Sequence, residues 1–138
     1  MKIYTGYYGN MRAYNGMQCV GISVGTPRWL KAPLPNCRQL NPEYRMLKLE
    51  REPYTEAYNA LLATLDPETI LTYLRRVSGG KDVVLLCYER PEDFCHRQLV
   101  AQWLQDKAGI EVKEYYAPFV YKKPEPAPEP ESEQMELF

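Results

Sequence analysis

The sequence predicts one α/β domain, a small and mostly parallel β-sheet flanked by helices, followed by a disordered C-terminal tail. The continuous apolar run Val83–Cys87 is typical of a central parallel strand that is covered on both sides. From residue 69 to residue 115, helical and strand-like patterns alternate, as they do in a doubly wound sheet. A chain of 138 residues suffices for one domain with its own core and is too short for two.

Four segments are predicted to be strands, at residues 2–8, 17–24, 82–89 and 110–115. The second and third are apolar on both faces, which indicates buried strands, whereas the fourth alternates and is expected at an edge. Together with the helices between them, these strands predict a Rossmann-like arrangement. Because ligands of such sheets bind beyond the carboxyl ends of the strands, the segments 5–7, 23–29 and 88–97 are expected to surround any site.

Three helices are predicted, at residues 55–65, 69–77 and 94–107. Asp66, Pro67 and Glu68 supply an N-cap, a proline at the first helical position and a first-turn acid, and Gly79 ends the second helix. Gly109 ends the third helix, whose apolar stripe is carried by Leu99, Val100, Trp103 and Leu104. Four prolines within residues 27–42 predict a long ordered loop or lid.

Charge and cysteine content restrict the possible environments of the chain. The tail from Pro124 to Phe138 holds five glutamates and no basic residue, so removing its charges from the net −1 leaves +4 on residues 1–123. A mildly basic body permits a phosphate-bearing ligand without requiring one. Cys19 and Cys87 lie in apolar strands and are expected to be buried thiols, not disulfide partners. No signal peptide or membrane-spanning run is recognisable, which predicts a protein of the reducing cytoplasm with no membrane partner.

The segment 87–97 is the strongest candidate for a site. A helix N-terminus attracts anions and lowers the pKa of a first-turn cysteine. Cys95 is therefore a candidate nucleophile, and His96, the only histidine, and Glu89 are candidate proton carriers. At the same edge the candidate anion-binding residues are Arg97, Arg28 and Thr5, and the candidate supporting residues are Cys87, Tyr88 and Tyr7.

Structural alternatives exist for each of these residues. Cys95 and His96 could belong to the buried stripe of the helix, and Glu89 could simply pair with Arg97. A metal site is not expected, because the spacing C-x7-C-H of Cys87, Cys95 and His96 matches no standard ligand pattern, although the two cysteines could approach each other. No cofactor is expected either.

The segment Val84–Arg97, VLLCYERPEDFCHR, together with Leu99–Leu104, resembles a bacterial and phage family known as domain of unknown function 488. The opening IYTGY and the block ISVGTPRW, which ends at Trp29, are similar to the same family, so the resemblance spans residues 2–116. It implies a compact α/β fold with Cys-His-Arg at the site but no settled reaction. The residues it carries over are Cys87, Glu89, Cys95, His96, Arg97 and Arg28. Many members have Asp-x-Arg after the second strand, where this chain has Ser23, Val24 and Gly25.

The domain is expected to end near residue 121, with a Pro/Glu linker at 122–133 that cannot bury apolar area. Residues 134–138, QMELF, resemble the peptide by which bacterial proteins dock on the replication sliding clamp. Leu137 and Phe138 would fill an apolar pocket, Gln134 would bond at its rim, and the linker would keep the domain nearby.

These features predict a DNA-associated enzyme that acts on a nucleotide or DNA substrate and is recruited to the sliding clamp. Two alternatives stay open. One is a non-catalytic adaptor that binds a nucleotide or DNA end. The other is a small enzyme of nucleotide or sulfur metabolism that has no connection with the clamp.

Overall fold

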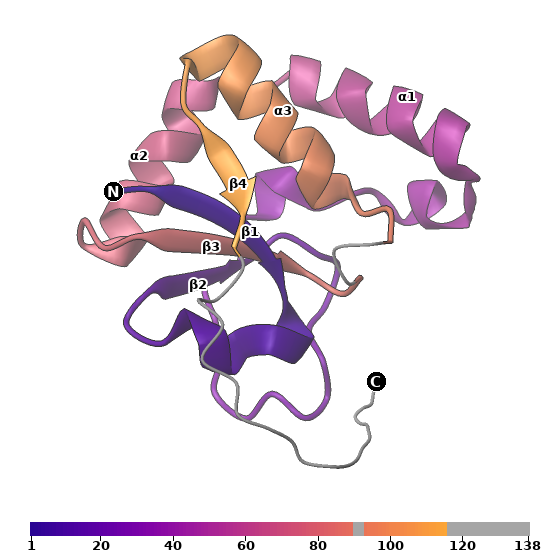
Figure 1. The fold of residues 1–138 in the computed structure, drawn as a ribbon. Coiled ribbons are helices and arrows are strands. Elements are labelled where there is room, and N and C mark those ends of the chain that lie inside the picture. Colours follow the sequence, from indigo (N-terminus) through magenta and orange to yellow (C-terminus); the bar gives the residue numbers. More distant parts are fainter. Residues whose placement is uncertain (90–92, 116–138) are drawn as a thin grey trace.

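A computed structural model describes residues 1–89 and 93–115 and contains a four-stranded parallel sheet (Figure 1). The strands are β1 (Ile3–Tyr7), β2 (Gln18–Gly21), β3 (Val83–Cys87) and β4 (Val112–Glu114), in the order β2-β3-β1-β4. Each neighbouring pair runs parallel, with Tyr7 beside Cys87 and Thr5 beside Glu114. The predicted α/β class, the inner position of β3 and the edge position of β4 are confirmed.

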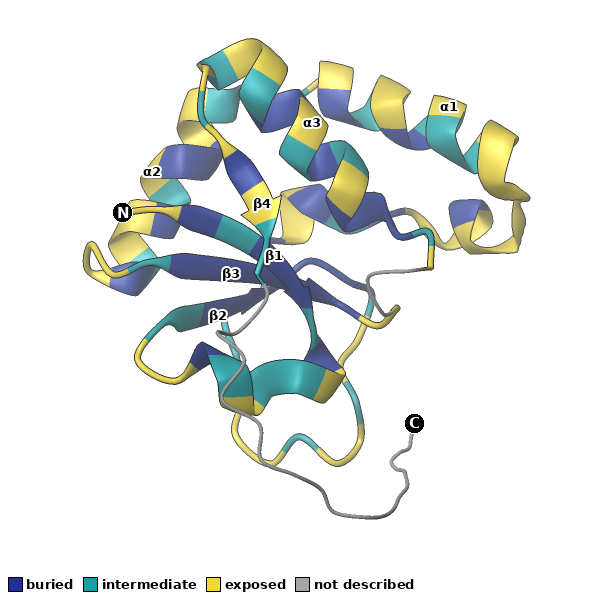
Figure 2. Cartoon of the chain, viewed as in Figure 1, coloured by how far each residue is buried: buried dark blue, intermediate teal, exposed yellow. Residues whose placement is uncertain are grey.

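Three α-helices lie on one face of this sheet: α1 (Arg51–Ala63), α2 (Pro67–Ser78) and α3 (His96–Ala108) (Figure 1). Alternate residues of β3, Val83 and Leu85, point into this layer because successive side chains of a strand face opposite sides. They pack with the inward residues of the helices, among them Tyr58, Leu74 and Trp103. Figure 2 shows this burial along the strands and on the inner sides of the helices.

The opposite face of the sheet is covered by a 3-10 helix, η1 (Tyr8–Tyr14), which the sequence patterns did not predict. Tyr8 and Tyr14 are buried there against Val84 and Leu86, the other alternate residues of β3. A 3-10 helix turns every three residues, so it lacks the 3.6-residue apolar period by which α-helices are recognised. Two further 3-10 helices, η2 (Arg38–Leu40) and η3 (Tyr44–Lys48), lie between β2 and α1.

Most predicted helix ends agree with the structure. Asp66 accepts a hydrogen bond from the Glu68 amide at 3.0 Å, and Gly79 and Gly109 end α2 and α3 in the left-handed conformation. Helix α1 begins at Arg51, four residues before the predicted start, and contains Pro53 in its first turn. Proline is tolerated there because the amides of the first turn have no intrahelical partner.

Strand β2 is shorter than predicted, ending at Gly21 and not at Val24. Beyond it the Ile22 amide still donates to the Leu86 carbonyl, and Asn36 forms a parallel bridge with Gly21. The proline-rich stretch 27–42 therefore borders β2 directly, with η2 as its one short helix. Within the described part of the chain, no helix is long and apolar enough to cross a membrane.

Candidate functional site

The carboxyl end of β3 and the N-terminal end of α3 meet at a cavity of about 300 Å³. Strand β3 ends at Cys87, and Cys95 is the N-cap of α3, so His96 and Arg97 are the first two residues of that helix. The cavity is lined by residues of β3, α3, α1 and the loops before them: Ser23, Val24, Pro42, Leu47, Leu49, Arg51, Tyr54, Cys87, Tyr88, Glu89, Phe94, Cys95 and His96. The structure thus brings five predicted site residues to one cavity, namely Cys87, Tyr88, Glu89, Cys95 and His96.

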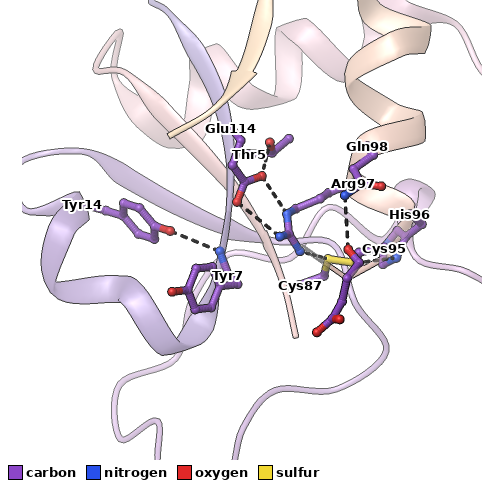
Figure 3. A network of polar contacts seen from close by, with 10 residues as sticks. Thr5, Tyr7, Tyr14, Cys87, Cys95, His96, Arg97, Gln98 and Glu114 are labelled. Atoms are coloured by element: carbon purple, nitrogen blue, oxygen red, sulfur yellow. Dashed lines mark hydrogen bonds and ion pairs between the residues drawn. A yellow bond between two sulfur atoms is a disulfide. The ribbon is translucent and has the colours of Figure 1, made fainter. Parts of the chain in front are cut away.

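Cys87 and Cys95 are joined by a disulfide (Figure 3). The expectation that Cys87 is a free buried thiol was therefore wrong, whereas Cys19 is free and buried as expected. The reason is topological, because β3 and α3 bring both cysteines to the same sheet edge although eight positions separate them. Both residues are almost completely buried, and both border the cavity.

The His96 ring is held between the sheet and the disulfide. Its Nε2 lies 2.6 Å from the Ile22 carbonyl oxygen, which can only accept a hydrogen bond, so Nε2 carries the proton. Its Nδ1 lies 3.6 Å from Cys95 Sγ, and the Tyr58 ring stands edge-on to the imidazole at 5.1 Å. Burial lowers the pKa of His96 to about 4. The imidazole is therefore neutral at pH 7, with an unprotonated Nδ1 directed toward the sulfur.

Arg97 does not line the cavity but belongs to the neighbouring polar network that Figure 3 shows. Its side chain is completely buried and forms a two-point ion pair with Glu114 at the end of β4, with Nε–Oε1 at 3.0 Å and Nη2–Oε2 at 3.2 Å. The third nitrogen, Nη1, donates to Cys87 Sγ at 3.0 Å. Thr5 Oγ1 donates to Glu114 Oε1 at 2.8 Å. Arg97 thus pairs with Glu114, and the alternative of a Glu89–Arg97 pair does not occur.

The other predicted residues lie outside the cavity lining. Thr5 is buried beside Glu114, and Arg28 is exposed and does not border the cavity. The Tyr7 amide donates to the Tyr14 hydroxyl at 3.2 Å. Of the block 23–25, Ser23 and Val24 border the cavity, and Ser23 Oγ donates to the Gly25 carbonyl and bonds the Tyr8 hydroxyl. Gln134, Leu137 and Phe138 lie outside the described residues.

Sequence reasoning missed Glu114 and the contribution of α1. A carboxylate at the end of a predicted parallel strand was a usable signal, because a fully buried arginine requires an acidic partner. Helix α1 supplies Arg51 and Tyr54, which both contact Phe94: the guanidinium carbon lies 4.8 Å from the ring centroid, and the two rings meet edge-on. Burial and the nearby Glu89 raise the pKa of Tyr54 to about 12. One wall of the cavity is therefore aromatic, and among the described lining residues Arg51 is its one cation.

The fold and the site together define a class: a small parallel α/β protein with a sulfur–imidazole site at the carboxyl edge of its sheet. The family model DUF488-N3a, described as the active DUF488-N3 subclade, matches residues 28–108. This match covers more than half of the chain, and the chain belongs to the domain of unknown function 488 family. The matched segment contains the whole Cys-His-Arg region and all of the cavity lining except Ser23 and Val24. No curated protein and no solved structure matches the chain.

Proposed function

We propose that the protein is a bacterial or phage enzyme of the cytoplasm that acts on a nucleotide or DNA substrate in this cavity. The observation that carries the proposal is the meeting of Cys87, Cys95, His96 and Glu89 at one cavity on the carboxyl edge of a parallel sheet. Groups able to attack, to accept a proton and to donate one therefore face the same volume. In cytoplasmic proteins, moreover, a disulfide is usually transient and catalytic or redox-sensing.

The proposed reacting group is Cys95 in the reduced form of the chain. Its sulfur borders the cavity at the N-terminal end of α3, where the helix field favours the thiolate. His96 Nδ1, unprotonated at neutral pH, lies within reach to accept a hydrogen bond from the Cys95 thiol. Arg97 donates to Cys87 Sγ and so favours the negatively charged form of the second sulfur.

The aromatic wall supports a substrate that contains a nucleobase. Tyr54, Tyr88 and Phe94 offer ring faces and edges, and nucleobases stack on such side chains. Among the described residues that line the cavity, Arg51 is the cation available for a phosphate, because the guanidinium of Arg97 is already paired with Glu114. This geometry moves the proposed phosphate contact from Arg97 to Arg51.

Thiol reactivity tests the enzyme proposal against a non-catalytic adaptor. In the reduced full chain, Cys87 or Cys95 should be alkylated by iodoacetamide at pH 7 much faster than Cys19 and Cys37. Burial raises the pKa of both Cys19 and Cys37 to about 11, so these two thiols are built-in slow controls. Nucleotides or short oligonucleotides that bind in the cavity should slow the fast reaction. Equal slow alkylation of all four cysteines would favour the adaptor.

We further propose that residues 134–138 recruit the enzyme to the sliding clamp. Binding of purified bacterial clamp should be measured for the full chain, for a chain truncated after Tyr121, and for Leu137→Ala/Phe138→Ala. The full chain should bind, and both variants should lose most of the affinity because the two apolar anchors are absent. Unchanged binding by the variants would show that the tail is not the docking element. Failure of the full chain to bind would leave the third alternative, a metabolic enzyme unconnected with the clamp.

A further inference from the structure

We propose that the reduced protein binds one thiophilic divalent cation, with Zn²⁺ the expected ion, through Cys87 Sγ, Cys95 Sγ and His96 Nδ1. This inference goes beyond the proposed function, because it concerns the occupant of the site and holds for any substrate. The three donor atoms all lie within 4.8 Å of one another. Zinc bonds of about 2.3 Å to sulfur and about 2.0–2.1 Å to nitrogen span such a separation.

The orientation of His96 is the second, independent observation. Metal-ligating histidines usually donate their other ring N–H to a backbone carbonyl or a carboxylate, which fixes the tautomer and the ring. Here Nε2 donates to the Ile22 carbonyl at 2.6 Å, so the lone pair of Nδ1 faces the sulfurs. A histidine that only filled the core would not need its free nitrogen directed at two cysteines.

The surroundings of the sulfurs also suit a cation. Arg97 donates an N–H to Cys87 Sγ, and its own charge is balanced by Glu114, so this outer pair is neutral. Two thiolates then balance the double charge of the ion, which leaves no net charge in a site whose three donor residues are at most 5 % exposed. Sulfur and imidazole donors select Zn²⁺ and similar ions over Mg²⁺, Ca²⁺ and Mn²⁺.

Three protein ligands leave a fourth tetrahedral position, and all three ligand residues border the cavity. Closed structural zinc sites use four protein ligands, whereas catalytic sites keep one position for water or substrate. The described part of the chain offers three such ligands, which corresponds to the open type. The disulfide form and the metal form exclude each other, because sulfurs bonded to each other have no thiolate charge to give.

The sequence spacing does not reveal this site. Standard zinc motifs place ligands on one short turn or helix, whereas here one ligand ends a strand and two begin the helix that follows the next loop. Only the packing of α3 against β3 brings the donors together.

The test uses the full chain, reduced and desalted without oxygen, and titrated with Co²⁺ or Zn²⁺. One equivalent of Co²⁺ should give the visible absorption of tetrahedral cobalt and a thiolate-to-cobalt charge-transfer band, and one equivalent of Zn²⁺ should displace it. Cys87→Ser and Cys95→Ser should each weaken binding by more than the roughly 10–100-fold that loss of an outer-shell partner costs. His96→Ala should also weaken it and change the cobalt spectrum.

Two controls keep the result decisive. Cys19→Ser/Cys37→Ser should bind as the wild type does, because both cysteines are free and buried away from the cavity lining. The wild type with its disulfide intact should bind no cobalt. This comparison needs no substitution, so it stays informative even if a variant fails to fold. Failure of the reduced wild type to take up stoichiometric metal, or full binding by Cys87→Ser/Cys95→Ser, would overturn the proposal. Unchanged binding by His96→Ala would overturn the assignment of the imidazole. Alkylation by iodoacetamide, measured with a chelator present, tests the proposed function separately.

Discussion

Replacing Glu114 by glutamine should destabilise this protein far more than the loss of an ordinary surface ion pair. The Arg97 side chain is fully buried, and Glu114, 15 % exposed, is its acidic partner. Glutamine keeps the shape and one oxygen acceptor, but it removes the negative charge and turns an N–H group toward the guanidinium. The cationic guanidinium then stays buried without compensation.

The expected size follows from that burial. Removing one partner of a buried ion pair costs about 3–5 kcal/mol, because an unpaired charge is left in the interior. In addition, Thr5 Oγ1 and two guanidinium N–H groups lose a charged acceptor. For a domain of this size, roughly 4 °C per kcal/mol predicts a melting temperature lower by about 12–20 °C.

Urea unfolding of the full chain, followed by circular dichroism, measures the change if the slope of the transition stays constant. Glu43→Gln is the matched control, since Glu43 pairs with Arg45 at 2.7 Å with both side chains more than half exposed. Such exposed pairs contribute about 0–1 kcal/mol. Arg97→Met/Glu114→Met, which removes both charges, should be less destabilised than Glu114→Gln. Similar small losses for Glu114→Gln and Glu43→Gln would refute the reasoning.

Three further predictions concern local features. Because the pKa of His96 is about 4 in the folded state and about 6.5 when unfolded, protonation favours unfolding. With a chelator present, the free energy of unfolding should keep its full His96 contribution above pH 6.5 and fall by about 3 kcal/mol toward pH 4. Urea unfolding across this pH range should show no such fall for His96→Gln. Gly6→Ala should lower the free energy of unfolding in urea by at least about 1–3 kcal/mol, because the new Cβ would collide with the Tyr14 hydroxyl and lie 2.9 Å from Val84 Cγ1. Gly9→Ala is the control and should lose less, because its Cβ has its closest contact at 3.2 Å. Asp66→Ala should lower the free energy of unfolding by about 1 kcal/mol because the Glu68 amide loses its acceptor, and Asp66→Asn should retain most of it.

The sheet and its helices were predictable because their causes are local. The run Val83–Cys87 is apolar at every position and became the inner strand, and Asp66, Pro67 and Gly79 define the ends of α2 by their own backbone preferences. The helix η1 was not predictable in the same way. Its tyrosines are buried because they pack on the apolar face of the sheet opposite the α-helices, and that face exists only in the assembled fold.

In the candidate site, too, the features with local causes were predictable and those with long-range causes were not. Residues 87–97 were identified from the sequence because one strand, one loop and one helix start are adjacent in the chain, and helix starts favour thiolates and anions. The partners of these residues come from far away: Glu114 from β4, the Ile22 carbonyl from the end of β2, and Tyr54 from α1. No spacing rule relates such positions.

The sequence by itself determined the fold class, the strands and α-helices, and the segment that borders the cavity, because periodicity, capping and helix fields act within a few residues. The tertiary structure decided what each group does. It buried Arg97 against Glu114 and off the cavity wall, joined Cys87 to Cys95, and aimed His96 Nδ1 at the Cys95 sulfur. The charge state and the reactivity of a side chain depend on burial and on neighbours brought together by packing, and those are properties of the folded chain alone.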